Sequence, residues 1–174
     1  MKNETIIFGG GCFWCTEAIF ESLKGVESVL PGYAGGTTDS PDYWSIHGGK
    51  SGHAEVIEVT YDPAVVQFND LLTVFFAMHD PTTLNRQGAD VGSEYRSLVL
   101  YTTDAQKAAT EQFIAALNDS GPKVVTEVKP LDKFYPAEES HRQFYKNNPD
   151  SPYCQVVINP KMAKLKARFN ELIK

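Results

Sequence analysis

A glycine run between an apolar stretch and a helix-forming stretch is the feature that most constrains the fold. The apolar residues 5–8 precede Gly9-Gly10-Gly11, and Cys12-Phe13-Trp14-Cys15 follows directly. Glycine lets the backbone turn sharply, so the pattern predicts a strand, a tight turn and a helix that reaches Leu23. This junction fixes where the first strand meets the first helix, and it brings two cysteines to the start of that helix.

Cys12 is the first candidate for chemistry. It falls in the first turn of the predicted helix, where free N–H groups and the helix dipole favour an anion. Such a position lowers the pKa of a thiol and produces the thiolate nucleophile. A free cysteine is more often a buried structural residue, but this position favours a reactive thiol. Phe13 and Trp14 are predicted to wall it, because two bulky groups at a tight turn can hardly both enter the core.

The three cysteines indicate redox chemistry rather than a disulfide framework, because an odd number pairs poorly. Residues 1–4 run directly into the first predicted strand, without a secretory signal, so we expect a reducing, cytoplasmic location. A zinc site needs about four ligands. Cys154 and four scattered histidines supply no second paired motif beside Cys12 and Cys15, so we expect no metal.

Length and charge limit the fold and the partners. The 174 residues are most simply one catalytic domain, residues 1–174, which is long enough for a sizeable core. The net charge of −6 argues against nucleic acid as a partner. The longest apolar run, within residues 71–78, is too short to span a membrane. We expect a monomer that binds neither nucleic acid nor membrane.

The pattern of strands and helices predicts an α+β fold: a two-layer α/β sandwich with a ferredoxin-like core and long loops. Asn69 could cap a helix over residues 70–79, and Thr103 and Asn159 begin two more. The apolar run 154–158 predicts a buried strand that contains Cys154. Further strands are predicted over residues 26–33, 96–101 and 124–128.

Two long loops carry further candidates. Residues 37–52 contain Tyr43, and residues 79–95 contain Asp90 and Tyr95. Long loops inside a compact domain are often functional. A loop tyrosine commonly packs at the edge of a core, but a phenol can also donate a hydrogen bond to a developing oxyanion. We expect both loops to converge with the first strand–turn–helix junction at one edge of the sandwich.

Glu55 is the candidate acid. Residues 53–61 alternate in the manner of a strand, and Glu55 shares a face with Ile57, Val59 and Tyr61. A glutamate near the end of a strand is often simply solvated. If this face is buried, desolvation raises the pKa of Glu55. The carboxyl would then be neutral near pH 7 and could act as a general acid.

The segment Gly10–Cys15 closely resembles the active-site signature of the A-type peptide methionine sulfoxide reductases. Other segments resemble elements of the same family in the same order, and the likeness covers roughly residues 5–157. Any one piece has little specificity, but the ordered set is highly specific. The matching segments are Gly32–Gly36, Ser51–Glu55, Asp80–Thr82, Asp90–Ser97 and His141–Tyr145.

The resemblance implies thiol-dependent reduction of methionine-S-sulfoxide, free or in proteins, to methionine, and hence repair of oxidised proteins. It implies one epimer because separate enzymes handle the two. By the same resemblance Cys12 is the nucleophile and Glu55 is the acid that faces the sulfoxide oxygen. The remaining roles are a methyl pocket, two oxygen-binding phenols and a carboxylate that orients substrate. They fall on Phe13 with Trp14, on Tyr43 with Tyr95, and on Asp90, respectively.

The resemblance further implies no metal or organic cofactor. A sulfenic acid on Cys12 would condense with a second thiol to form an intramolecular disulfide, which thioredoxin then reduces. We expect Cys15 to be this resolving thiol because it lies within one helical turn of Cys12, and Cys154 is the alternative. Many members carry Gly at the position of Cys15, and some place resolving cysteines in a C-terminal tail, whereas no cysteine follows Cys154 here.

Two other functional classes stay open. One is a thioredoxin-like disulfide oxidoreductase, which also carries Cys-x-x-Cys at a helix start. In that case Glu55 and the two loop phenols would have no role. The other is a non-catalytic module that binds a metal or a thiol.

Overall fold

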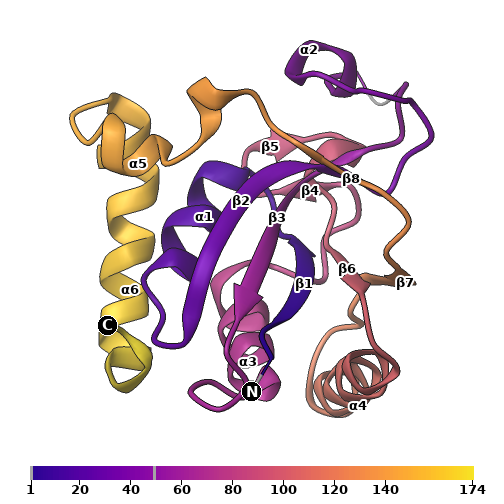
Figure 1. Cartoon of the computed structure of the whole chain (residues 1–174), viewed down its shortest axis with the longest axis vertical. Helices are drawn as coiled ribbons and strands as arrows, with labels where there is room; N and C mark the ends of the chain where they lie inside the picture. Colours follow the sequence, from indigo (N-terminus) through magenta and orange to yellow (C-terminus); the bar gives the residue numbers. More distant parts are fainter. Residues whose placement is uncertain (1, 49) are drawn as a thin grey trace.

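The computed structural model describes residues 2–48 and 50–174. A six-stranded sheet runs through its centre in the order β7-β6-β1-β3-β2-β8, with α1 and α6 to one side and α4 below it in Figure 1. The strands are β1 (Glu4–Gly9), β2 (Val26–Ala34), β3 (Ala54–Tyr61), β6 (Leu98–Tyr101), β7 (Glu127–Pro130) and β8 (Phe134–Pro136). A separate hairpin joins β4 (Arg86–Gln87) to β5 (Asp90–Val91).

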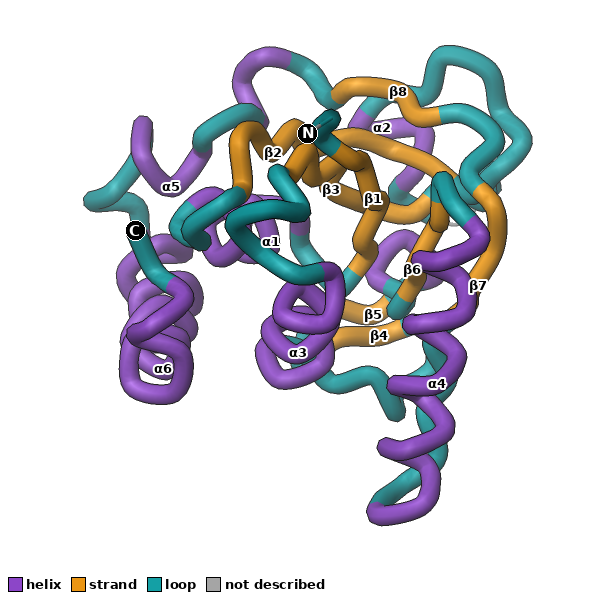
Figure 2. Tube along the Cα trace, turned by 60° about the horizontal axis from the view of Figure 1, so that its bottom comes forward, coloured by secondary structure: helices purple, strands orange, loops and turns teal. Residues whose placement is uncertain are grey.

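The helices form a second layer against the sheet, and Figure 2 shows α1, α3 and α6 on the same side of it. They are α1 (Phe13–Glu21), α2 (Tyr43–Ile46), α3 (Phe68–Met78), α4 (Asp104–Ser120), α5 (Phe144–Asn147) and α6 (Asn159–Phe169). Short 3-10 turns occupy Ser93–Tyr95, Glu139–His141 and Asn170–Leu172, and a π-helical turn occupies Cys154–Ile158.

The order β1-α1-β2-β3-α3-β6 is a βαββαβ unit whose strands lie side by side as β6-β1-β3-β2. Each neighbouring pair in this unit is antiparallel. This is the ferredoxin-like arrangement, so the predicted α+β sandwich is confirmed. At the two edges, β7 adds in parallel to β6 and β8 adds antiparallel to β2.

The alternation of β3 determines which face of the sheet is the main core. Ile57 and Val59 point into the large cluster under the helices, where Phe8 stacks on Phe75 at a ring distance of 4.5 Å. Burying each such side chain contributes about 1.5–3 kcal/mol. Val56 points to a smaller cluster on the opposite face. Because Glu55 has the same parity as Ile57, it points to the helix side, toward the start of α1.

Several predicted boundaries are wrong. Helix α3 begins at Phe68 rather than at residue 70, because Gln67 and not Asn69 is its N-cap and Asp70 accepts a hydrogen bond from the Gln67 N–H. The strand predicted over 124–128 is shifted, since β7 starts at Glu127. Within the 37–52 loop, residues 43–46 form α2, capped by the Asp42 side chain.

The run that contains Cys154 is a π-helical turn and not a strand. Its first turn is held by Ser151, whose hydroxyl accepts from the Cys154 N–H at 3.2 Å. Cys154 is fully buried against Cys15 and Ala18 of α1, and the turn leads into α6. A short apolar run fits a buried strand and a buried helix equally well. Here packing against α1 selects the helical form.

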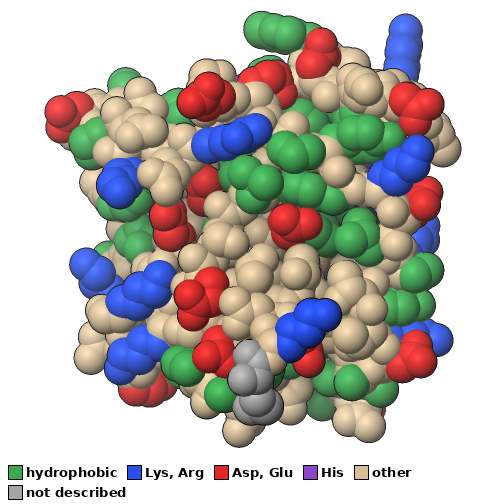
Figure 3. Space-filling model, in the orientation of Figure 1, with side chains coloured by type: hydrophobic (Ala, Val, Ile, Leu, Met, Phe, Trp, Pro, Cys, Tyr) green, Lys and Arg blue, Asp and Glu red, His purple; other side chains and the backbone are tan. Residues whose placement is uncertain are grey.

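On the face shown in Figure 3, acidic and basic side chains are interspersed, and neither sign forms a continuous patch. Within residues 2–48 and 50–174, no helix combines the length and the apolar character that crossing a bilayer requires.

Candidate active site

A cavity of about 110 Å³ gathers the residues that the sequence singled out. It opens where the start of α1, helix α2, strand β3 and the segment before β6 meet. The lining residues are Cys12, Phe13, Trp14, Tyr43, Glu55, Asp90, Tyr95 and Tyr153. The two long loops and the strand–turn–helix junction therefore do converge. Cys15 does not line the cavity, and Tyr153 is a member that the sequence analysis missed.

Cys12 stands immediately before α1 and not in its first turn. It is the N-cap residue, with extended backbone angles, and its carbonyl accepts from the Cys15 N–H at 3.1 Å. The turn before Cys12 requires glycine at position 11. Gly11 has a φ of +96°, and a Cβ added there would lie only 2.8 Å from Cγ of Gln87. The thiol thus lies at the open N-terminal end of the helix, beside the cavity.

The resting thiol pair corrects the expectation of a lowered pKa at Cys12. The neighbouring Cys15 thiol, together with burial and the nearby Glu55, raises the pKa of Cys12 well above its usual range. The interaction with the Cys12 thiol lowers the pKa of Cys15 to about 6, helped by the charge of Lys161. The two thiols titrate as a unit. Passing the proton of Cys12 to the Cys15 thiolate places the negative charge on Cys12, at the helix N-terminus.

Glu55 is 2% exposed, as the strand pattern predicts for a buried face. Its Oε1 accepts a hydrogen bond from the Phe13 N–H at 3.1 Å. The pKa of Glu55 is raised to about 8. Burial is the main cause and the charges of Asp90 and Glu94 add to it, whereas the hydrogen bond from Phe13 opposes the shift. The side chain is therefore a neutral acid near pH 7, bound to the residue that follows Cys12.

The two phenols reach the cavity from different segments. Tyr43 begins α2, where its N–H donates to Oε2 of Glu138 at 3.1 Å and its ring stacks on His141. Tyr95 ends the 3-10 turn Ser93–Tyr95. Burial and the nearby Glu55 raise the pKa of both hydroxyls. Both therefore keep their protons at neutral pH and can donate hydrogen bonds.

The aromatic wall has one core member and one partly exposed member. Phe13 is fully buried yet borders the cavity, so it serves the core as well as the wall. Trp14 is held flat by Phe144, at a ring distance of 3.7 Å, and its Nε1–H donates to Nδ1 of His141 at 3.2 Å. Only Phe13 enters the core, in agreement with the expectation that the two bulky groups can hardly both do so.

Three side chains around the cavity escaped the sequence analysis. Tyr153 approaches Sγ of Cys15 with its hydroxyl at 3.4 Å. His141 packs against Phe13, Trp14 and Tyr43. His47, directly after α2, contacts both Glu55 and Tyr95. The sequence assigned a role to none of them, although His141 begins the matching segment His141–Tyr145 and Tyr153 stands beside Cys154.

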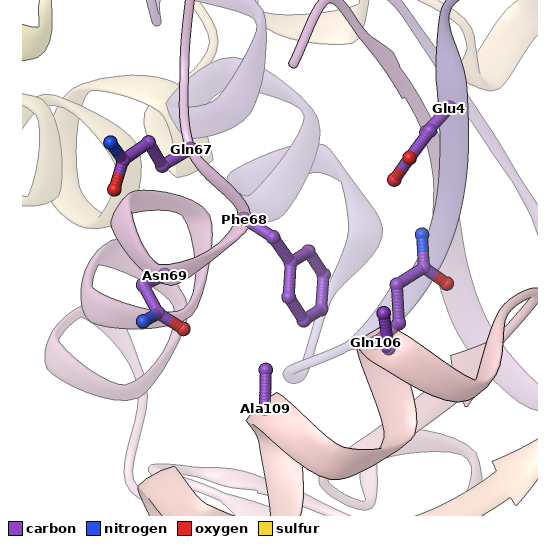
Figure 4. A pocket seen from close by; sticks show the side chains of 7 residues that line it. Glu4, Gln67, Phe68, Asn69, Gln106 and Ala109 are labelled. Atoms are coloured by element: carbon purple, nitrogen blue, oxygen red, sulfur yellow. The ribbon is translucent and has the colours of Figure 1, made fainter.

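A second hollow, which lies apart from the thiols, has different chemistry. The hollow in Figure 4 lies between the starts of α3 and α4 and the beginning of β1, and it is lined mainly by amide side chains and Phe68. It contains no thiol. Across the described ranges, 2–48 and 50–174, no three His, Cys, Asp or Glu side chains are grouped as metal ligands.

Comparison with known proteins places this geometry in a family. The sequence profile described as "Peptide methionine sulfoxide reductase" matches residues 4–173. The chain belongs to the peptide methionine sulfoxide reductase family. It is therefore an oxidoreductase. A relative named peptide methionine sulfoxide reductase MsrA, from Psychrobacter cryohalolentis, is 52% identical over 168 residues, which cover 97% of each chain.

Solved structures agree with this assignment. The reduced form of Mxr1 from Saccharomyces cerevisiae has a TM-score of 0.82 and 35% identity, over 88% of this chain and 90% of that one. A second structure, of the same yeast protein in complex with Trx2, has a TM-score of 0.59 and 25% identity, over 82% of this chain and 85% of that one.

Proposed function

We propose that this reductase converts methionine-S-sulfoxide, free or in proteins, to methionine, with Cys12 as the nucleophile. The observation that carries the proposal is the shared cavity. It combines one thiol at a helix N-terminus with a buried neutral carboxyl, two phenols and an aromatic wall. A thiol that only exchanged disulfides would need none of the last three.

The first step needs a proton on the sulfoxide oxygen, because this oxygen is otherwise a poor leaving group. Glu55 supplies it, while Tyr43 and Tyr95 donate hydrogen bonds to the same oxygen and stabilise the transition state. Sulfur of Cys12 attacks the substrate sulfur, an S–S bond forms, and the protonated oxygen leaves as hydroxide. Hydroxide then adds to the Cys12 sulfur and the S–S bond breaks, so the balanced products are methionine and the sulfenic acid of Cys12.

The cavity walls provide the selectivity. Phe13 and Trp14 form the apolar pocket for the S-methyl group and exclude water from the reacting sulfur. Asp90, on β5, also lines the cavity and orients the substrate. With the oxygen fixed by the acid and the phenols, and the methyl group fixed by the aromatic rings, only one configuration at sulfur aligns with Cys12.

The second step returns the enzyme to its reduced form. The Cys15 thiol attacks the sulfenic sulfur of Cys12, water leaves and a disulfide forms. The interaction between the two thiols, which is the largest influence on the pKa of each, supports this pairing. A dithiol then reduces the disulfide. The solved complex of yeast Mxr1 with Trx2 supports thioredoxin as that dithiol, and the reaction calls for no metal or organic cofactor.

The same proposal covers the chain as a whole. Residues 1–174 form a single catalytic domain that acts as a monomer in the cytoplasm on oxidised proteins, on peptides and on free methionine sulfoxide. These expectations come from sequence length, cysteine usage and charge. Size-exclusion chromatography with light scattering tests the monomer.

The deciding experiment is an epimer-resolved methionine sulfoxide assay with dithiothreitol as reductant. Loss of the S epimer with retention of the R epimer is expected. An insulin-reduction assay run in parallel tests the thioredoxin-like alternative, and metal analysis of the reduced protein tests the binding module. Rapid insulin reduction without sulfoxide reduction would contradict the proposal.

A further inference from the structure

His47 joins the buried acid to the solvent side of the cavity, and the reaction above assigns it no part. Its side chain is 27% exposed, against 2% for Glu55. It follows α2, the short helix at the top of Figure 1. Its Nε2 lies 3.1 Å from the Tyr95 hydroxyl and 3.6 Å from Oε2 of Glu55. One ring nitrogen therefore faces two of the groups that hold the sulfoxide oxygen.

The other ring nitrogen determines what Nε2 can do. Nδ1 lies 2.6 Å from the backbone carbonyl of Tyr43. A carbonyl can only accept, so Nδ1 carries a hydrogen in every protonation state of the ring. In the neutral ring Nε2 is then an acceptor, and the Tyr95 hydroxyl donates a hydrogen bond to it. In the imidazolium Nε2 is a donor that lies 3.6 Å from Oε2 of Glu55, and the Tyr95 hydroxyl is released to donate into the cavity.

The proposed reaction creates a need for this second state. When Glu55 gives its proton to the sulfoxide oxygen, a carboxylate forms at a site that is 2% exposed. A buried carboxylate without a partner is strongly unfavourable. Within the part of the chain that the structure describes, the Phe13 N–H is its one hydrogen-bond donor, and the charges of Asp90 and Glu94 oppose its formation. A cation or a second proton donor at Oε2 would remove most of this cost.

We propose that His47 is the positioning residue that supplies this counter-charge and proton, so that its imidazolium passes the Nε2 proton to Oε2 as Glu55 protonates the sulfoxide oxygen. This inference rests on the proposed function. Glu55 ends the step as the acid again, and His47 ends it as neutral imidazole. The imidazole then takes a proton from solvent, through its exposed edge. No electron moves in this transfer.

Other ionisable groups face the pair from several elements. They are Tyr43 on α2, Cys12 and Cys15 at the start of α1, Asp90 on β5, Glu94 and Tyr95 in the 3-10 turn, and Glu138 with His141 near the next 3-10 turn.

The test is the rate of the first turnover, measured by rapid quench without a recycling reductant, for wild type, His47→Ala and His47→Gln. General acid–base assistance contributes 10²–10⁴-fold, so we expect His47→Ala to be slower by about 100-fold at pH 6. Added imidazole should restore part of the rate in proportion to imidazolium. The advantage of wild type should shrink toward pH 9, because the ring loses its charge. The amide of His47→Gln offers the hydrogen bonds without the titration, so it should stay slow.

Trp44→Ala is the matched control, because Trp44 lies on α2, the short helix that precedes His47, and is 80% exposed. It should show no response to imidazole. Wild-type rates in either His47 variant would overturn the inference. A loss that does not vary with pH and does not respond to imidazole would also overturn it, since it would mark a purely structural role. Failure of the proposed function is a separate result, in which wild type itself forms no methionine.

Discussion

The N–H of Phe13, the first residue of α1, donates a hydrogen bond of 3.1 Å to Oε1 of Glu55. Phe13, the residue after Cys12, thus holds the carboxyl of Glu55 in position. A helix N-terminus ordinarily favours a carboxylate, but burial outweighs this effect and raises the pKa of Glu55 to about 8. The contact therefore fixes the position of a carboxyl that keeps its proton, which is the state a general acid needs.

Glu55→Gln removes that proton donor without changing the shape of the side chain. By analogy with the loss of an oxyanion-hole donor, we expect the transition state to lose ~2.7–4 kcal/mol, or roughly 10²–10³ in kcat. The measurement is steady-state reduction of methionine-S-sulfoxide with dithiothreitol. Glu58→Gln is the control, because Glu58 lies on the same strand with the opposite parity. Equal rates for Glu55→Gln and wild type would remove Glu55 as the acid.

The pH profile should report Glu55. Its pKa of about 8 means that the first-turnover rate falls as pH rises through that value, because the acid form is lost. Glu94 is 4% exposed, and its charge is one of the effects that raise this pKa. Glu94→Gln should therefore move the descending limb to lower pH. A limb that stays in place would show that Glu94 does not act on Glu55.

The contribution of Glu55 to stability should also fall as pH rises. The native protein holds a proton on Glu55 up to a pKa of about 8, whereas an unfolded chain releases it near the ordinary value of 4.5. Stability from this group is complete below pH 4.5 and is lost as pH rises toward 8. Glu55→Gln has no such loss, so its gain over wild type in urea midpoint should grow from pH 5 to pH 8 and then level off. A difference that is constant with pH would contradict the raised pKa.

The resolving thiol can be identified by peptide mapping after one turnover without reductant. We expect a disulfide between Cys12 and Cys15 in wild type and in Cys154→Ser, and none in Cys15→Ser. One helical turn allows the Cα separation of about 7 Å that a disulfide requires. The first turn of α1 must adjust so that the bond can reach its specific dihedral. A disulfide between Cys12 and Cys154 in wild type would assign the role to Cys154.

Much of this site was predictable because its groups have local signatures. The glycine turn predicted the position of Cys12 to within one residue, and the parity of β3 predicted the buried face of Glu55. The helical turn at Cys154 was not predictable, because the packing that selects it comes from α1. The pKa of Cys12 was predicted in the wrong direction, since the sequence shows the helix start but not the burial of the thiol beside Cys15 and Glu55. His47 was missed because its partners, Glu55 and Tyr95, come from other elements.

The most direct test of the account is the amount of methionine formed from methionine-S-sulfoxide in one turnover, without reductant, by wild type and by Cys12→Ser. Wild type should form one equivalent of methionine, because each Cys12 accepts one oxygen atom and no dithiol is present to recycle it. Cys12→Ser should form none, while circular dichroism shows that it keeps its fold. Methionine formation by Cys12→Ser at the wild-type level would contradict the assignment of Cys12 as the atom that takes the oxygen.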